Sequence, residues 1–373
     1  MVNFHISFYP WSLSAFVAIL MKQKVLTRIL FYETNVCLRF CVFTISINKT
    51  DRRGFLENRD KIVIGSRGSK LALIQANWVK SELEKANKET EFVIEVIKTT
   101  GDKILDTPLA KIGDIGLFTK ELEEALLDKR VDLVVHSAKD MPTAIPDNLE
   151  IGAVTKREDP HDALISKDNQ SLQDLPKGAT LGTSSLRRRA QVLAVRQDLN
   201  IVDLRGNLDT RISKLESGEL DAIVVAMAGL NRLGRGDVAS EIIPSDIMLH
   251  AVGQGALCIE VRDNDEQVKK MIQIIQHFDT RYAVMAERVL LKRLQGGCQI
   301  PIGAHAEVIF PVNLKMEAVV CSLDGTTVIR DSIEGKVDDY STMGNELAER
   351  LLGRGGRQIL EEIRTKLAEE QVD

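Results

Sequence analysis

From Lys61 onward, short aliphatic runs alternate with amphipathic stretches, and this alternation predicts strands separated by helices. The runs expected to form strands are Ile62–Ile64, Phe92–Ile97, Val131–Val135, Ile201–Leu204 and Ala222–Ala226. Amphipathic helices are expected between them, at Phe118–Leu127, Leu186–Val195 and Leu208–Leu215. Repetition of strand, helix and strand predicts a parallel or mixed sheet flanked by helices, which is the α/β class.

One further helix should begin directly after the turn Gly65–Ser69. Its apolar stripe is expected to run through Leu71, Ile74 and Trp78. Ser69 is a suitable N-cap, because its hydroxyl can accept a hydrogen bond from a free N–H group of the first turn.

The pattern changes after Asp279. A long helical stretch, Arg281–Leu294, ends at a pair of glycines and is followed by a series of shorter elements. The expected strands are Ala304–Ile309, Lys315–Cys321 and Thr327–Ile333, and helices are expected from about 340 to 370. Helices on one face of a small antiparallel sheet are the simplest arrangement, so a smaller α+β domain is expected at the C-terminus.

The first sixty residues differ in composition from the rest. Ten of the 17 aromatic residues lie before residue 56, and the longest apolar stretch, Trp11–Met21, is about half of what a spanning helix needs. A secretory signal would require Lys or Arg before that stretch, and none is present. Two interpretations stay open: an organelle transit peptide, or a poorly ordered leader that precedes the true start.

Charge and cysteine content exclude several classes. Residues 1–60 hold eight of the 49 basic and four of the 54 acidic residues, which leaves 41 basic and 50 acidic residues in 61–373. So acidic a body argues against nonspecific nucleic-acid binding, which depends on phosphate neutralisation. The five cysteines include no CxxC pair, so a disulfide framework and a zinc site are not expected. A reduced, cytoplasmic protein is predicted, with a plastid or other organelle as the alternative if residues 1–60 are a transit peptide.

No GxxxxGK[ST], HExxH or GxSxG motif is present. The sequence therefore gives no support for a nucleotide-phosphate loop, a zinc hydrolase or a serine hydrolase. Short polar motifs instead follow the predicted strands, where ligands gather in open α/β sheets. The first is Gly65–Ser69. It is either an anion site, formed by helix N–H groups and the Arg67 guanidinium, or a tight turn with a solvated arginine.

Arginines recur after the predicted strand ends. The segment Gly182–Arg189 places small hydroxyl residues at a helix start and three arginines behind them, although consecutive arginines cannot share one helix face. Arg205, Arg211 and Arg232 follow later strands. Each bidentate contact between an arginine and a carboxylate contributes about 1.5–3 kcal/mol, so the set suits a small ligand with many carboxylates. The alternative is a basic, exposed helix.

Two further segments carry candidate reactive groups. Asp140 leaves a buried strand just before Pro142, and it is either an acid–base group and counter-charge or an aspartate that organises the turn. His136 on the same strand is expected to be packed and hydrogen-bonded. Cys298 follows two glycines, unlike Cys258 and Cys321 within apolar runs, so it is either a nucleophile or attachment point or an inert thiol.

Taken together, these motifs resemble the porphobilinogen deaminase family, also called hydroxymethylbilane synthases. The resemblance covers 61–373, and the chain before Lys61 lies outside it. The matching segments are Gly65–Ser69, Thr99–Asp102, Gly116–Leu122, His136–Pro142, Gly182–Arg188, Leu204–Asn207, Ala251–Ala256 and Gly296–Gly303.

The resemblance implies a transferase of tetrapyrrole biosynthesis. Such enzymes carry one dipyrromethane cofactor, which a thioether joins to the residue matching Cys298. Four porphobilinogen molecules are added in turn with loss of ammonia, and hydroxymethylbilane is released by hydrolysis. The residue matching Asp140 assists deamination and condensation and stabilises positive charge on the pyrrole units. The expected enzyme is a monomer whose partner is porphobilinogen, with no metal, nucleic acid or membrane.

The acetate and propionate groups would be bound by eight further side chains. Those expected at the cofactor are Lys139, Ser185, Arg187 and Arg188. Those expected at the substrate are Arg67, Arg205, Arg211 and Arg232. Six linked rings would carry about a dozen carboxylates, which only a cleft with several arginines can hold.

The implied fold has two α/β domains that resemble the halves of a periplasmic-type binding protein, joined by two crossing segments, and a smaller α+β domain. Domain 1 is expected at 61–155 and 256–277, domain 2 at 156–255, and domain 3 at 278–373. One departure is Ile115, where family members commonly have a lysine, so the part of that loop in substrate binding is in question. The cysteine motif has a bacterial form, which weighs against a transit peptide.

The main alternative is a two-lobed solute-binding module that closes on a small polycarboxylate without chemistry. It would account for the arginines and the α/β halves but not for Asp140 beside Lys139, nor for Cys298 on a third domain. A regulatory ligand-sensing domain is the third possibility, and it lacks a recognisable helix-turn-helix partner.

Overall fold

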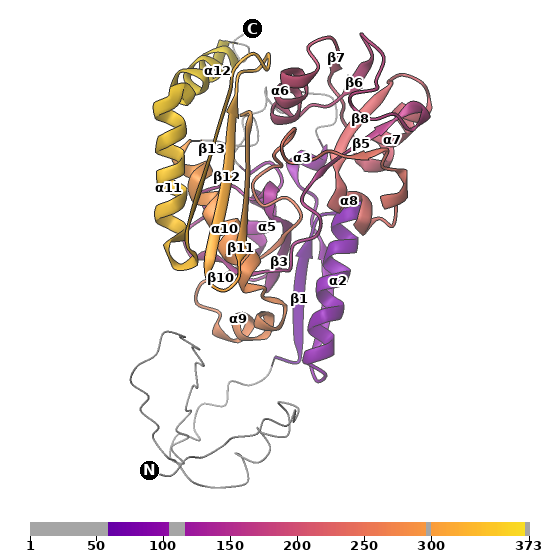
Figure 1. Ribbon diagram of the computed structural model, residues 1–373. Coiled ribbons are helices and arrows are strands. Elements are labelled where there is room, and N and C mark those ends of the chain that lie inside the picture. The colour runs from indigo at the N-terminus through magenta and orange to yellow at the C-terminus, as the bar shows by residue number, and fades with distance from the viewer. Residues whose placement is uncertain (1–58, 104–115, 296–299, 370–373) are drawn as a thin grey trace, which may run out of the picture. The chain divides into compact units, whose positions relative to one another are not determined.

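The computed structural model describes residues 59–103, 116–295 and 300–369 (Figure 1). These residues form two five-stranded sheets and one three-stranded sheet. Within these ranges, no helix combines the length and the apolar character needed to cross a membrane. The two larger sheets are mixed and the small one is antiparallel, which confirms the predicted α/β class with a smaller α+β part.

The first sheet has the strand order β2-β1-β3-β10-β4. Its strands are β1 (Lys61–Ser66), β2 (Glu91–Val96), β3 (Leu133–Ser137), β4 (Leu149–Val154) and β10 (Leu257–Arg262). Strand β1 runs parallel to β2 and β3, whereas β10 lies antiparallel between β3 and β4. The helices that follow these strands are α2 (Lys70–Ala86), α3 (Thr100–Lys103), α5 (Lys120–Leu127) and α9 (Glu266–Ile272).

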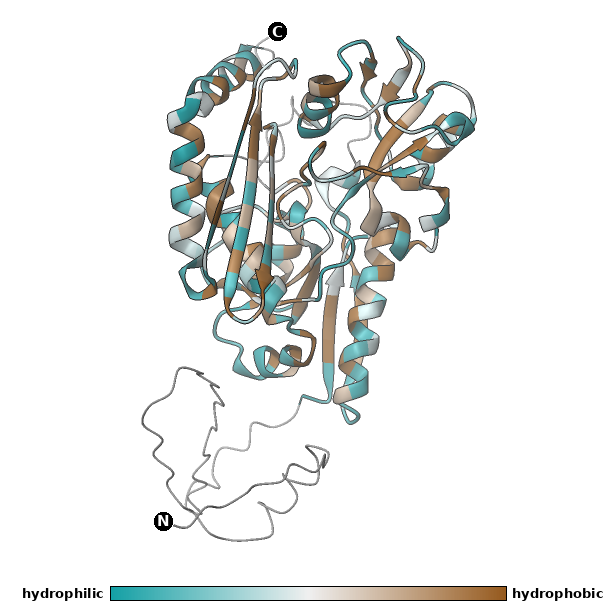
Figure 2. Ribbon diagram, in the orientation of Figure 1, coloured by the Kyte–Doolittle hydropathy of each residue, from teal (hydrophilic) through white to brown (hydrophobic). Residues whose placement is uncertain are grey.

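Side chains of this sheet alternate between two cores. Ile62 and Ile64 pack with α2 and α9 on one face, while Val134 packs with α5 on the other. This alternation follows from the two-residue period of a strand. Helices therefore cover both faces, as a sheet with parallel strands requires. Figure 2 shows the hydrophobic residues concentrated along β1 and polar residues recurring along α2.

The second sheet has the order β7-β6-β8-β5-β9. Its strands are β5 (Asp162–Ser166), β6 (Thr180–Gly182), β7 (Asn200–Val202), β8 (Ala222–Ala226) and β9 (Glu241–Ile242), and its helices are α6 (Leu186–Val195), α7 (Leu208–Glu216) and α8 (Met227–Arg232). Strand β6 is parallel to β7 and β8, and β5 is antiparallel to β8 and β9. The chain passes between the two sheets twice, from β4 to β5 and from β9 to β10, as the resemblance implied.

The third sheet consists of β11 (Ile302–Ile309), β12 (Asn313–Cys321) and β13 (Val328–Lys336) in sequence order. Helices α10 (Phe278–Arg293), α11 (Tyr340–Leu351) and α12 (Arg357–Glu369) share one hydrophobic core with it. A π-helical turn, Leu352–Gly356, joins α11 to α12. In Figure 1 these elements carry the orange and yellow colours of the C-terminal part.

Most predicted elements are confirmed, and two coincide with the observed bounds: Ala222–Ala226 is β8 and Leu186–Val195 is α6. Ser69 caps α2 by accepting a hydrogen bond from the Ala72 amide at 3.3 Å. The apolar stripe expected on α2 is wrong, however. Its fully buried residues are Gln75, Ala76, Val79 and Leu83, while Trp78 is 45% exposed, because the core contacts lie on the adjacent face of the helix.

Candidate active site

A cavity of about 590 Å³ opens at the carboxyl ends of strands from both five-stranded sheets. Residues that follow β1, β3, β7 and β8 line it, as predicted for ligand sites in open α/β sheets. Its basic lining residues are Arg67, Lys70, Lys139, Arg188, Arg205, Arg211 and Arg232, and its acidic ones are Asp102, Asp140 and Asp209. Positive charge is therefore concentrated here in a chain whose formal net charge is −5.

Arg67 is held at the cavity wall by two partners. Its Nη2 lies 2.5 Å from Oδ1 of Asp102, and its guanidinium carbon lies 4.1 Å from the centre of the Phe118 ring. Burial alone would raise the pKa of Asp102, but the hydrogen bond and charge of Arg67 outweigh this and lower it. Arg67 is thus placed in a fixed position and is not a solvated turn arginine.

The segment after β3 brings a carboxylate and an amine into the same cavity. Strand β3 ends at Ser137, a short 3₁₀ turn covers Ala138–Asp140, and Met141 is extended, as expected before a proline. Lys139 and Asp140 both line the cavity. Lys139 Nζ lies 3.4 Å from Oε1 of Gln254, and burial lowers its pKa to about 8, although the Asp140 charge opposes the shift.

The imidazole of His136 faces away from this chemistry. It is buried, and its Nε2 lies 3.0 Å from Oε2 of Glu260 on the neighbouring strand β10. The expectation that His136 is a packed and hydrogen-bonded histidine is confirmed.

The arginines of α6 surround a buried carboxylate. Arg187 Nη1 donates to Asp162 Oδ2 at 2.6 Å, and Arg188 donates to Oδ1 through Nε at 3.0 Å and Nη2 at 2.7 Å. Although burial by itself would raise the pKa of Asp162, the two guanidinium charges lower it well below its usual range. Arg189 is exposed, which agrees with the argument that three consecutive arginines cannot share one face.

Of the α6 residues proposed at the cofactor, only Arg188 lines the cavity among the described residues. Ser185 is the N-cap of the helix and accepts a hydrogen bond from the Arg188 amide. Arg187 also donates to the Leu249 carbonyl at 2.8 Å, so its described contacts are internal.

The other three arginines face the cavity with few counter-charges. Arg205 has a buried Nη2 that has no hydrogen-bond partner among the described residues. Arg211 donates through Nε to the Gly206 carbonyl, and burial together with the nearby Arg188 and Arg205 lowers its pKa to about 10. Arg232 donates to the Gly255 carbonyl at 2.6 Å. A buried, unpaired guanidinium nitrogen is costly, so this arrangement is suited to an anionic ligand.

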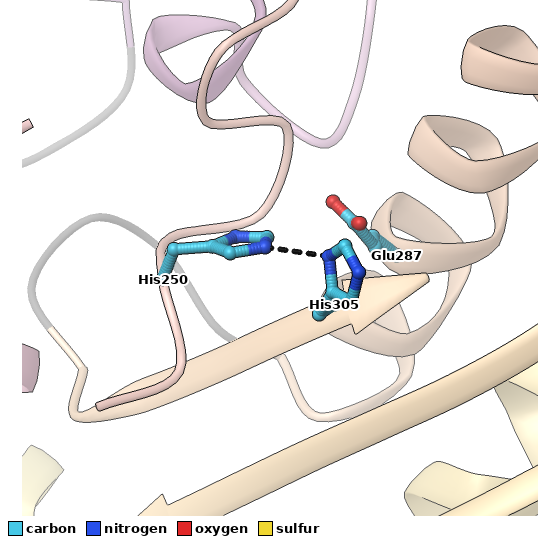
Figure 3. Close-up of side chains that lie close together, drawn as sticks. All are labelled: His250, Glu287 and His305. Atoms are coloured by element: carbon cyan, nitrogen blue, oxygen red, sulfur yellow. Dashed lines mark hydrogen bonds between the residues drawn. The ribbon is translucent and has the colours of Figure 1, made fainter. Parts of the chain in front are cut away.

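One group outside the cavity has the composition of a metal site. Ligand atoms of His250, Glu287 and His305 lie within 4.8 Å of one another (Figure 3). Both carboxylate oxygens of Glu287 already accept hydrogen bonds from Arg157, at 2.8 and 2.9 Å, and His250 Nε2 lies 2.7 Å from Nδ1 of His305. Because the Arg157 guanidinium already binds both oxygens of the Glu287 carboxylate, its charge would repel a metal cation there. The contacts are those of an internal ion-pair network.

Three features singled out in the sequence lie outside the described ranges, namely Cys298, Ile115 and the predicted leader as far as residue 58. The two other cysteines discussed, Cys258 and Cys321, are buried, and burial raises the pKa of their thiols to about 11 and about 12. Both lie within apolar runs, and a thiol in such an environment stays protonated and unreactive.

Sequence reasoning did not single out the acidic partners that hold the arginines in place. Asp162 begins an apolar strand and is completely buried, and Gln254 donates to its Oδ1 at 3.0 Å. An acid within an apolar run indicates a buried counter-charge, so that signal was present. Its partners on α6 lie 25 and 26 residues away, and nothing in local spacing pairs them.

The chain matches the models of one protein family over most of its length. Residues 62–270 match the family model "Porphobilinogen deaminase, dipyromethane cofactor binding domain", and residues 281–353 match "Porphobilinogen deaminase, C-terminal domain". The chain belongs to the porphobilinogen deaminase family. The family, the enzyme class and the dipyrromethane cofactor that the sequence predicted are thereby confirmed. The alternative of a non-catalytic solute-binding module is not favoured.

Curated porphobilinogen deaminases support the same assignment over nearly their whole length. That of Desulforamulus reducens is 54% identical over 306 residues, covering 82% of this chain and 99% of the relative. That of Carboxydothermus hydrogenoformans is 51% identical over 306 residues, with 82% and 98% covered. That of Geobacter sulfurreducens is 51% identical over 304 residues, with 82% and 95% covered.

Two solved structures with distant similarity carry the names of binding proteins. A methionine-binding lipoprotein from Bacillus subtilis matches with 17% identity and a TM-score of 0.36, covering 57% of this chain and 90% of its own. The periplasmic aliphatic sulphonate binding protein from Escherichia coli matches with 17% identity and a TM-score of 0.35, covering 63% and 70%.

Proposed function

We propose that this chain condenses four porphobilinogen molecules stepwise, with loss of ammonia, onto a dipyrromethane held by a thioether at Cys298, and releases hydroxymethylbilane by hydrolysis. It would act as a monomer in the cytoplasm, without nucleic acid or membrane as a partner. The observation that carries this proposal is that Asp140 lies in one cavity together with seven basic side chains, one of which has an unpaired buried nitrogen.

The residues of the cavity fit a polycarboxylate cofactor and substrate. Arg188 and Lys139 would hold cofactor carboxylates close to Asp140, with Ser185 fixing the start of α6 and Arg187 fixing Asp162. Arg67, Arg205, Arg211 and Arg232 would bind the acetate and propionate groups of arriving substrate. The bound cofactor supplies the pyrrole carbon to which the substrate is joined.

Asp140 is the proposed catalytic residue. It is the carboxylate that leaves β3 into the cavity beside Lys139, and Arg211 contributes positive charge close to it. A carboxylate placed there can accept a proton from the substrate and oppose positive charge that develops during loss of ammonia. Arg188 and Arg67 pair with Asp162 and Asp102 rather than with Asp140, which leaves the Asp140 carboxylate available for this role.

We further propose that each sheet is the centre of one domain. Domain 1 would comprise 61–155 and 256–277, domain 2 would comprise 156–255, and domain 3 would comprise 278–373. The pairing of β10 with β3 and β4 supports the return of the chain to domain 1.

The first prediction tests the attachment. Wild-type protein incubated with porphobilinogen should gain mass by a covalent adduct, whereas Cys298→Ser should carry only the mass of its amino acids. Intact-protein mass spectrometry makes the measurement, and Cys258→Ser, at a buried position, is the matched control that should still load. An adduct of equal mass on Cys298→Ser would contradict the thioether. Wild-type protein that leaves porphobilinogen intact would contradict the function itself.

The second prediction concerns Lys139. Its pKa of about 8 means that the amine is charged below pH 8 and neutral above it, so its attraction for carboxylates weakens as the pH rises through that value. The rate at which cofactor-free protein incorporates porphobilinogen should therefore fall above pH 8. Lys139→Arg should flatten this limb of the profile, because a guanidinium stays charged. Identical profiles for the two proteins would remove Lys139 from carboxylate binding.

A further inference from the structure

A buried arginine of α10 contacts the Asp140 turn, residues 138–142. The Arg288 guanidinium donates from Nη2 to the Pro142 carbonyl at 2.6 Å and from Nη1 to the Met141 carbonyl at 3.4 Å. A longer contact of 3.5 Å joins Nη2 to the Thr143 carbonyl. Arg288 is 7% exposed, so these hydrogen bonds lie in the interior of the protein.

The two ends of the Asp140 turn are held by different groups. At its entry, the Ala138 amide donates to the Ala256 carbonyl at 3.0 Å. At its exit, Pro142 has no amide hydrogen, and no backbone amide of the described residues donates to the carbonyl of Met141 or Pro142. Because backbone carbonyls in the interior need donors, the Arg288 guanidinium is the group that fixes the exit of the turn.

Arg288 carries its charge into the interior without a carboxylate bound to it. Burial is the largest influence on its pKa and lowers it, and no acid among the described residues is hydrogen-bonded to its guanidinium. Glu260, an acid that acts on Arg288 through space, is within hydrogen-bond distance of His136 instead. A buried charge is destabilising unless polar groups surround it, so the carbonyls of the Asp140 turn and the guanidinium stabilise each other.

Apolar packing places the same face of α10 against the turn. Val284 lies one helical turn before Arg288, so the two side chains point to the same side of the helix. Val284 is buried in one cluster with Ala138 and Met141, the residues on either side of Lys139 and Asp140. The contact between α10 and the turn is therefore a packed one and does not consist of the hydrogen bonds alone.

The residue before Arg288 holds a neighbouring segment of the same turn. Glu287, which Figure 3 shows on its helix, accepts a hydrogen bond from the Gly253 amide at 2.7 Å. Gly253 has a φ of +72°, and a Cβ added to it would lie 2.9 Å from the Cβ of Ala138. Two consecutive residues of α10 thus fix the Asp140 turn and the backbone that packs on it.

From these contacts we infer that Arg288 is a positioning residue for Asp140: by holding the carbonyls that follow the aspartate, it couples α10 to the place of the Asp140 carboxylate in the cavity. The inference rests on the proposed catalytic role of Asp140. A displacement of about 1 Å in a reacting group can cost about 10²-fold in rate, so loss of Arg288 is expected to lower kcat.

The third prediction tests this coupling with Arg288→Met. Methionine keeps an unbranched apolar side chain at the buried position and removes the charge and the donors, so the variant should stay folded. Its holoenzyme should show a kcat about ten- to a hundredfold lower with an unchanged KM for porphobilinogen, because the arginines proposed at the substrate are not altered. Steady-state kinetics per cofactor-loaded molecule make the measurement, with loading taken from intact mass.

A double-mutant cycle tests whether Arg288 acts through the aspartate. Adding Arg288→Met to Asp140→Asn should lower kcat by less than about twofold further, because the carboxylate that Arg288 positions is already absent. A residue that merely supports the fold would lower kcat by the same factor with and without the Asp140 carboxylate.

Two matched variants complete the experiment. Arg288→Lys should recover part of kcat, because an ammonium can still donate to the Pro142 carbonyl. Arg281→Ala is the control on the same helix. Arg281 donates to the Ile151 carbonyl at 3.1 Å, so it joins α10 to β4 rather than to the Asp140 turn, and its loss should leave kcat at the wild-type value.

The outcomes separate the inference from the function. A wild-type kcat for Arg288→Met would overturn the positioning role, even if the melting temperature fell. A change confined to KM would overturn it too, as would equal losses of kcat in the two arms of the cycle. If Arg288→Met does not fold, Arg288→Lys enters the same cycle with a smaller expected loss. Inactive wild-type and Arg281→Ala proteins would instead contradict the proposed function.

Discussion

Asp140→Asn should lower kcat about 10²- to 10⁴-fold while leaving the protein folded. The substitution keeps the shape of the side chain and removes both its charge and its ability to accept a proton at neutral pH. Asp140 lines the cavity after the end of β3, and its charge interacts with those of Lys139 and Arg211. The measurement is kcat per cofactor-loaded molecule, together with the thermal midpoint.

The matched control for Asp140 is Asp209→Asn. Asp209 lines the same cavity but pairs with Lys70 and Arg235 at positions that are substantially exposed. Solvent screens such pairs, so this variant should stay within about threefold of wild type. Turnover of Asp140→Asn within the same threefold range would remove Asp140 from the mechanism.

Asp162→Asn should lower the free energy of unfolding by about 3–5 kcal/mol, because it leaves two buried guanidiniums without their counter-charge. Asp162 is completely buried, and Arg187 and Arg188 are 5% and 6% exposed. Urea unfolding of the wild type and the variant at pH 7 measures the difference. Asp198→Asn is the control: it removes a carboxylate that pairs with Arg196 near the surface, and its effect should be clearly smaller.

The pH dependence of this difference has a definite sign. The guanidiniums depress the pKa of Asp162 in the folded state, so its contribution is complete above the unfolded value near 3.9 and is lost as the pH falls through the lower folded value. The gap between wild type and Asp162→Asn should therefore be constant from pH 7 to about 5 and should narrow below about pH 4. A gap that widens on acidification would show that Asp162 is not ionised in the folded protein.

Periodicity located most elements but not their pairing. The runs that became β1, β2, β3, β7 and β8 are strongly aliphatic and follow turn residues, so local sequence was sufficient. The five remaining strands of the two larger sheets, β4, β5, β6, β9 and β10, were not predicted. Strands β6 and β9 are short, β5 begins with Asp162 and β10 ends with Arg262, and β4 contains Glu150 and Gly152. Partners distant in sequence stabilise β4 and β5.

The face of α2 illustrates the same limit. Leu71, Ile74 and Trp78 form a stripe that local spacing favours, yet the buried residues are Gln75, Ala76, Val79 and Leu83. Gln75 is buried because its amide is hydrogen-bonded to Ser137 at the end of β3. A polar residue on a core face becomes acceptable only when a partner from another element satisfies it, and sequence spacing does not reveal that partner.

The chain's own residues determined the class of fold, because aliphatic runs set the strands. They also predicted the chemistry, because arginines and Asp140 after strand ends suit a polycarboxylate ligand. Only the tertiary structure decided which cations are available to it. Asp162 pairs with Arg187 and Arg188, of which only Arg188 lines the cavity. Asp102 and Phe118 hold Arg67, and Arg205 keeps a buried nitrogen unpaired. The reason is physical: charge type is a property of one residue, whereas the pairing of a buried charge depends on groups that folding brings together from distant positions.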